Sequence, residues 1–169
     1  MVTEARALKA EAKKSGEKVQ QVKTKEAVYP PLLFGYKPRK GGPEGTFNPM
    51  DLIAAVRSGL PGNTIKAVAE LLQLPLGDVY SLLHITSRTA QRMIKSERLE
   101  VDVSDRLVQL IKLHKRCMEV FQDNEKMIRW LKTPNFALGD QTPLSLLDTT
   151  DGLELVTKSL TKIEYGVFA

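Results

Sequence analysis

Four hydrogen-bonding side chains recur at helical spacing between residues 88 and 95. Arg88, Gln91, Arg92 and Lys95 stand at positions i, i+3, i+4 and i+7, so a helix would present all of them on one face. Arginine can form two hydrogen bonds with guanine in the major groove of DNA, and glutamine can do the same with adenine. This face therefore predicts a helix that reads base edges.

The same segment has two other features that such a helix needs. Ser87 and Thr89 place hydroxyl groups at its start, where phosphate oxygens can be held beside backbone N–H groups. Ala90, Met93 and Ile94 supply an apolar face that can pack against a core. Any basic amphipathic helix has such faces, so the prediction also depends on what precedes the segment.

A helix is predicted over residues 76–84, immediately before this segment. Only Ile85 and a capping Thr86 join the two helices, which is the tight connection of a helix-turn-helix motif. Tyr80 and His84 occupy the positions where this motif usually has a small residue and a glycine.

A second helix pair, over residues 65–84, competes for the same role. Ala69 would lie where its two helices cross, and Val79 and Leu82 would anchor its second helix. That second helix is poor in cations and carries Asp78, which would repel phosphate. We favour the frame of residues 76–95 and keep the frame of residues 65–84 as the alternative.

Helix start and stop signals divide residues 48–169 into short helices, and no useful stretch shows strand-like alternation. Asn48 and Pro49 begin the first helix, and Asn63 caps the second. A longer helix is expected over residues 102–121. We therefore predict an all-α fold.

Further helices are expected near the end of the chain. Asp123 caps a helix over residues 124–132, and Thr142 with Pro143 starts a short helical turn. A last helix, capped by Thr149 or Thr150, carries a stripe at three- and four-residue spacing: Leu153, Val156, Leu160, Ile163 and Val167. The stripe belongs either to an intramolecular core or to a second subunit, because a module of about fifty residues can hardly complete its own core.

The charge of +5 is distributed unevenly. Residues 1–40 carry ten Lys or Arg against four Glu, whereas residues 134–169 carry two Lys against five Asp or Glu. Breakers such as Pro30 and Pro31 follow the basic stretch, so residues 1–47 are predicted to be an arm and a linker. The arm is either a disordered solubilising tail or a segment that adds phosphate contacts on DNA.

Composition limits the classes of function. Two His and one Cys are too few for a zinc or iron-sulfur site, and we expect no metal and no cofactor. No apolar run of about eighteen residues and no signal-peptide core occurs, so neither membrane insertion nor secretion is expected. The acids Asp148, Asp151 and Glu154 could be imagined as paired catalytic carboxylates. They stand at a helix start, where acids serve capping and dipole roles, so we expect no enzyme.

Several motifs, taken in order, resemble one known family. They are Ile85-Thr86-Ser87-Arg88-Thr89-x-x-Arg92, Ser104-Asp105-Arg106-Leu107, Trp130-Leu131-x-Thr133-Pro134-Asn135-x-Ala137-Leu138-Gly139, Pro143-Leu144-x-Leu146-Leu147-x-Thr149 and Tyr165-Gly166-Val167. Their order is similar to that in the antitoxins of RES-Xre toxin-antitoxin pairs, also called the Xre/MbcA/ParS family. The resemblance covers roughly residues 50–169.

The resemblance implies a Cro/Xre-like helix-turn-helix domain, over residues 48–121, that represses its own operon. It also implies a small helical toxin-binding domain, over residues 122–169, that blocks the active site of a RES-domain toxin that consumes NAD. The antitoxin itself would hold no cofactor. A homodimer would match a palindromic operator, and the bacterial cytoplasm is the expected compartment. A stand-alone dimeric repressor without a toxin is the alternative.

The end of the chain is the candidate toxin-binding site within this resemblance. Tyr165, Val167 and Phe168 offer apolar anchors, and Gly166 permits close approach of a backbone. The carboxylate of Ala169 could meet cations that otherwise hold phosphate. The alternative is that these residues only complete the fold.

Overall fold

The computed structural model describes residues 49–166, and in this range the chain is helical with no strand. The predicted all-α fold is confirmed for this part of the chain. Its elements are α3 (Pro49–Ser58), α4 (Thr64–Leu72), α5 (Leu76–Leu82), α6 (Ser87–Ile94), α7 (Val101–Phe121), α8 (Asn124–Lys132), the 3-10 helix η1 (Phe136–Leu138), α9 (Pro143–Leu146) and α10 (Thr150–Glu164). The arm and linker of residues 1–47, Asn48, Val167, Phe168 and Ala169 lie outside the described residues.

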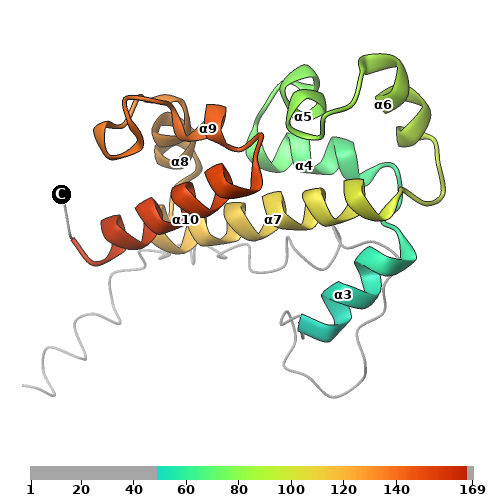
Figure 1. Ribbon diagram of the computed structural model, residues 1–169, viewed down its shortest axis with the longest axis horizontal. Coiled ribbons are helices and arrows are strands. Elements are labelled where there is room, and N and C mark those ends of the chain that lie inside the picture. The colour runs from blue at the N-terminus through green and yellow to red at the C-terminus, as the bar shows by residue number, and fades with distance from the viewer. Residues whose placement is uncertain (1–48, 167–169) are drawn as a thin grey trace, which may run out of the picture.

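The long helix α7 serves both halves of the molecule (Figure 1). Helices α3 and α4 pack against α7 towards one end of the molecule, and α8 and α10 pack against it towards the other. Leu107 and Leu110 of α7 are completely buried, and Val108 is nearly so. A helix covered on two sides needs an apolar surface wider than a single stripe. One hydrophobic core therefore runs from Ala55 in α3 to Leu160 in α10.

The apolar stripe of α10 belongs largely to the core of its own chain. Val156 and Leu160 are completely buried, and Leu153 and Ile163 are half-buried. Of the two alternatives for the stripe, the intramolecular core applies to Val156 and Leu160, because α7 supplies the surface that residues 122–169 lack by themselves. Since α7 reaches into both halves, the limits of residues 48–121 and 122–169 stay predictions.

Most helix starts follow the predicted capping signals. Three predicted caps accept hydrogen bonds from amides three residues on: Asp123 Oδ1 at 3.0 Å, Thr142 Oγ1 at 3.2 Å and Thr149 Oγ1 at 3.1 Å. Helix α4 begins after Asn63 as predicted, but the side chain of Asn63 makes no capping hydrogen bond. Its backbone is already helical, at φ −63° and ψ −15°, whereas a side-chain cap needs an extended residue.

Within residues 49–166, no helix combines the length and the apolar character needed to cross a membrane. In the same range, no group of three or more His, Cys, Asp or Glu side chains is arranged to hold a metal ion.

Candidate DNA-binding and partner-binding surfaces

Helices α5 and α6 are joined by a tight turn over residues 83–86, which is two residues longer than predicted. Helix α5 ends at Leu82 and α6 begins at Ser87. The amide of Ile85 donates a hydrogen bond to the carbonyl of Tyr80 at 3.0 Å and closes the turn. His84 has a φ of +55°, in the left-handed region that favours glycine. The histidine thus adopts the backbone conformation that the usual glycine of this motif would adopt.

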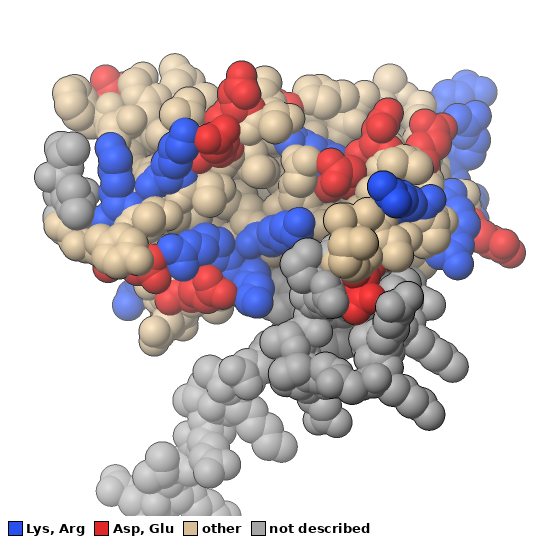
Figure 2. Space-filling model, turned by 60° about the horizontal axis from the view of Figure 1, so that its bottom comes forward, with Lys and Arg blue, Asp and Glu red and all other residues tan. Residues whose placement is uncertain are grey.

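Helix α6 presents the predicted polar face to solvent. Arg88, Gln91, Arg92 and Lys95 are all exposed, whereas Ala90 is completely buried. On the visible face of Figure 2, Lys and Arg side chains are spread along the molecule, and some of them lie, with Asp and Glu among them, towards the end where α6 lies. The predicted side chains therefore share one accessible, cationic surface, and their contact with DNA stays a prediction.

The two hydroxyl residues at the start of α6 differ in their surroundings. Ser87 is exposed, and Thr89 is half-buried. The amide of Thr89 donates to Oγ1 of Thr86 at 3.2 Å, and the two threonine hydroxyl oxygens lie 3.0 Å apart. Thr86 therefore caps the helix and engages Thr89, so Ser87 is the more accessible hydroxyl for a phosphate.

The competing helix pair, α4 and α5, has a less suitable outer face. The exposed residues of α5 are Leu76, Gly77, Asp78 and Ser81, and α5 has no Lys or Arg. In Figure 1, α6 lies at the end of the molecule away from α9 and α10, whereas α5 lies between them and α6. This placement favours α6 as the reading helix, and the choice of frame stays a prediction.

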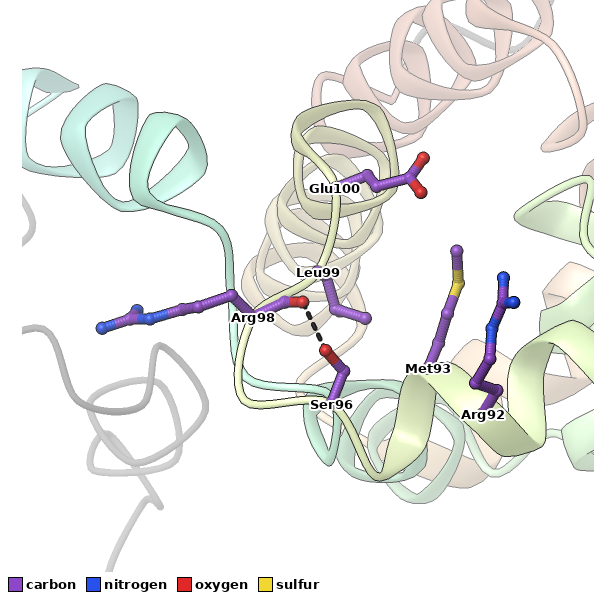
Figure 3. Close-up of a pocket in the computed structure, with 6 residues that line it drawn as sticks. All are labelled: Arg92, Met93, Ser96, Arg98, Leu99 and Glu100. Atoms are coloured by element: carbon purple, nitrogen blue, oxygen red, sulfur yellow. Dashed lines mark hydrogen bonds between the residues drawn. The ribbon is translucent and has the colours of Figure 1, made fainter.

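A cavity of about 220 Å³ lies beside the last turn of α6 (Figure 3). Its lining comes from the end of α6 and the loop that leads into α7: Arg92, Met93, Ser96, Arg98, Leu99 and Glu100. The guanidinium of Arg98 points away from Arg92, because its Nη1 donates to the carbonyl of Gly59 at 2.9 Å. Arg92 and Glu100 are therefore the charged side chains that face the cavity. The cavity extends the polar surface of α6, but its balanced charge does not make it a site for an anion.

Several motif residues that sequence reasoning left without a role bond to the backbone. The buried Oγ of Ser104 accepts a hydrogen bond from the amide of Leu60 at 2.9 Å. Arg106 donates through Nε to the carbonyl of Leu82 at 3.3 Å and through Nη2 to the carbonyl of Leu147. Arg106 follows Ser104 and Asp105 in a polar stretch of the long helix, so nothing in the local sequence points to backbone partners elsewhere in the chain. Its partners are far apart in the sequence, so their identity needed the structure.

Burial lowers the pKa of Arg106, and the nearby carboxylates of Asp148 and Asp105 act in the opposite direction. The side chain is half-buried, and its hydrogen bonds to the carbonyls of Leu82 and Leu147 hold it in place. The Arg106 side chain thus bridges the end of α5 and the residue after α9, and it is not a solvated surface cation.

The candidate toxin-binding residues lie at the exposed end of α10 as far as the structure describes them. Tyr165 is 75% exposed, and Gly166 is exposed with a φ of +65°. The preceding turn is tied to α7, because Arg116 donates to both carboxylate oxygens of Glu164. Val167, Phe168 and Ala169 lie outside the described residues, so the described part of this site is a well-anchored helix end with one large exposed ring.

Sequence reasoning missed other exposed apolar side chains in this half of the molecule. Phe136 in η1 is 84% exposed, and Leu155 in α10 is 51% exposed. Leu155 lies one residue away from the stripe position Val156, so it faces solvent while its neighbour is buried. The prediction from sequence considered only the residues of the apolar stripe, so it passed over Leu155, which lies outside that stripe.

Two family models match this chain. The Xre-like helix-turn-helix domain of antitoxins matches residues 51–112, and the C-terminal toxin-binding domain of Xre/MbcA/ParS antitoxins matches residues 118–166. Together the matches span nearly all of the described residues, in the order that the helices occur. The chain belongs to the Xre/MbcA/ParS family of antitoxins.

Curated relatives are similar over most of their length. The "Prs ADP-ribosylating antitoxin" of Sphingobium sp. (strain YBL2) is 25% identical over 132 residues, which are 72% of this chain and 83% of the relative. The "Antitoxin Xre" of Photorhabdus laumondii is 27% identical over 118 residues, which are 69% and 80%. The "Antitoxin Xre" of Yersinia enterocolitica is 26% identical over 120 residues, which are 70% and 81%.

Proposed function

We propose that this antitoxin neutralises a RES-domain toxin that consumes NAD, by blocking the toxin's active site, and represses its own operon by binding DNA. The observation that carries the proposal is the pairing of two accessible surfaces on one continuous hydrophobic core. One is the cationic face of α6, behind a helix-turn-helix connection. The other is the exposed end of α10, within the region that matches the toxin-binding domain.

The identity of the toxin rests on family likeness and on chemistry. The name of the Sphingobium relative includes ADP-ribosylation, a reaction whose ADP-ribosyl group comes from NAD. A partner that uses NAD would have a pocket for the phosphates of that nucleotide. The exposed Tyr165 and the residues after it, including Phe168 and Ala169, are the segment that we propose covers the entrance of such a pocket.

The proposed antitoxin acts as a homodimer in the bacterial cytoplasm, where both the operator and the toxin would be found. Two helix-turn-helix units related by a two-fold axis fit two half-sites of a palindromic operator. Because Val156 and Leu160 are buried within one chain, the contact between copies would involve other side chains. Leu155 is an exposed apolar residue of α10 that is suited to such a contact.

The DNA-binding proposal can be tested with single charge removals. Arg88→Ala and Arg92→Ala should each weaken operator binding about 5- to 150-fold in a gel-shift titration, because a base-reading arginine contributes about 1–3 kcal/mol. Lys132→Ala is the matched control, since Lys132 is an exposed cation at the end of α8. Unchanged affinity in both arginine variants would refute α6 as the reading helix and move the prediction to the frame of residues 65–84.

The toxin-binding proposal needs co-expression with a RES-type reading frame beside the gene. Full-length antitoxin should co-purify with that toxin and restore growth. A chain that lacks Gly166 to Ala169 should fold and bind operator as before but protect poorly. Full protection by the truncated chain would refute the plugging role of the tail. Failure of the full-length chain to co-purify or protect would leave the stand-alone repressor as the better description.

A further inference from the structure

The helix-turn-helix turn is bonded to the segment that leads into α10. Nε2 of His84 lies 2.7 Å from the carbonyl oxygen of Asp148. A carbonyl oxygen can only accept, so Nε2 must carry the proton and donate. Arg106 makes a second connection, because it donates to the carbonyls of both Leu82 and Leu147. Two side chains thus bridge the end of α5 and the corner between α9 and α10.

These bonds complete the backbone pairing at the end of α5. The last four carbonyls of a helix have no partner within the helix. Three carbonyls in the last turns of α5 accept from amides of the turn: Val79 from Leu83, Tyr80 from Ile85 and Ser81 from His84, each at 3.0 Å. The carbonyl of Leu82 accepts instead from Arg106 of α7. The turn is therefore completed by a residue outside the motif.

The corner between α9 and α10 is completed in the same way. The carbonyl of Leu147 accepts from Arg106, and the next carbonyl, that of Asp148, accepts from His84. The following residue, Thr149, is the N-cap of α10. Only this N-cap residue separates the bonded carbonyl of Asp148 from the start of α10, whose far end carries the candidate toxin-binding residues.

The backbone of His84 supports a role beyond closing the turn. Its φ of +55° is a conformation that glycine adopts more readily than histidine. Glycine would serve the turn equally well but could not reach Asp148. The histidine at this position is explained by the contact that its ring makes with the other half of the molecule.

We propose that His84 and Arg106 are positioning residues that couple the toxin-binding end of the antitoxin to the DNA-reading helix α6. Helix α6 begins three residues after His84, so a shift of the bonded corner moves or frees the reading face. A toxin that displaces α10 would act on this corner and thereby change operator affinity. Coupling is reciprocal, so operator binding would change toxin affinity by the same factor. This inference rests on the proposed binding of both toxin and operator.

The test measures operator affinity with and without toxin in wild type and in two variants. His84→Gly keeps the left-handed turn and removes the ring, and Arg106→Met keeps much of the side-chain stem and removes the guanidinium. The probes are the toxin encoded beside this chain and a labelled duplex of the promoter region. We expect wild type to show a toxin-dependent change of about 5- to 150-fold in operator affinity, which is typical of coupled sites.

The ratio of operator affinity with toxin to operator affinity without toxin should be close to one in both variants. Their affinity for toxin should stay that of wild type. Arg106→Lys, which can donate to only part of the same carbonyl set, should keep an intermediate ratio. A structural role alone would lower stability without changing the ratio of the two affinities. Lys132→Ala is again the control and should keep the wild-type ratio.

Two results would overturn the inference. One is a ratio of one in the wild-type chain, and the other is a wild-type ratio in both His84→Gly and Arg106→Met. Separate titrations of wild type with toxin alone and with operator alone test the proposed function. If both bind but their affinities are not coupled, only the coupling inference fails. If Arg106→Met does not fold, His84→Gly decides the outcome, because glycine is compatible with the φ of +55°.

Discussion

Replacing Gly152 by alanine tests whether the corner between α9 and α10 is as tightly packed as the structure shows. Gly152 is the third residue of α10 and is buried. A Cβ atom at this position would lie 1.9 Å from the carbonyl oxygen of Leu146 and 2.8 Å from Oγ1 of Thr149. The closest obstacle is backbone, so no change of rotamer can remove the clash. The corner itself has to move by about 1 Å.

Two opposing effects set the size of the change. Alanine is favoured over glycine within a helix by about 1 kcal/mol. Overpacking a tight site costs about 1–3 kcal/mol, and a backbone obstacle places this site at the upper end. We expect Gly152→Ala to lower the free energy of unfolding by about 2 kcal/mol. For a chain of this size, that corresponds to a decrease in Tm of about 4–8 °C.

Urea unfolding followed by circular dichroism at the helix signal measures this change directly. Gly77→Ala is the matched control, because Gly77 is the second residue of α5 and a Cβ there would meet nothing within 4 Å. Helix propensity should make the control up to about 1 kcal/mol more stable than wild type. If Gly152→Ala is as stable as wild type or more stable, while the control behaves as expected, the packing argument at this corner is refuted.

Three further predictions concern individual side chains. Burial raises the pKa of the Cys117 thiol to about 12, so the folded protein should resist iodoacetamide at pH 8 and react only after denaturation; labelling of the native protein would contradict this. Burial lowers the pKa of His114, so the unfolded chain binds its proton at a higher pH. The free energy of unfolding should then be highest above the ordinary histidine pKa and fall below it, by at most about 1.4 kcal/mol per pH unit. His114→Gln should reduce that slope in urea titrations between pH 8 and 5, and an unchanged slope would exclude His114 as its source. Thr86→Ala removes the acceptor of the Thr89 amide and should cost about 1 kcal/mol in the same assay, whereas Ser87→Ala, beside it, should cost less.

The helices were predictable because their ends depend on short-range signals. Asp123, Thr142 and Thr149 each bond to an amide three residues ahead, and that distance in the sequence is visible without a fold. Asn63 shows the limit of the same rule. Its residue type permits capping, but its backbone is already helical, and that conformation is set by the turn that precedes α4.

The sequence predicted the exposed face of α6, but it did not predict the hydrogen bonds that connect the preceding turn to the rest of the molecule. The spacing of Arg88, Gln91, Arg92 and Lys95 determines which way they point once the helix exists, and all four are exposed. The bonds of His84 and Arg106 join residues that are 64 and 41 positions apart. No periodicity in the sequence encodes such pairs, because they depend on how α5, α7 and α9 meet.

Several residues of the family-like motifs, together with Gly152, shape the backbone of the corner between α9 and α10 and of the start of α7. Ser104, Arg106 and Thr149 bond to backbone amides or carbonyls, and Gly152 leaves room for a backbone carbonyl. Bonds to backbone do not depend on the side chains of the residues that they hold, so the same corner can form in chains whose other residues differ. Relatives that share only 25–27% of their residues with this chain can therefore keep this framework. Under the proposed function, we expect discrimination between toxins to come from exposed positions that this framework does not use. Phe136 and Tyr165 are large apolar side chains exposed in the described part of the region that matches the toxin-binding domain. Exchanging Phe136 and Tyr165 for the residues of a relative should change which toxin is neutralised without changing the unfolding free energy by more than about 1 kcal/mol, because exposed positions contribute little to stability.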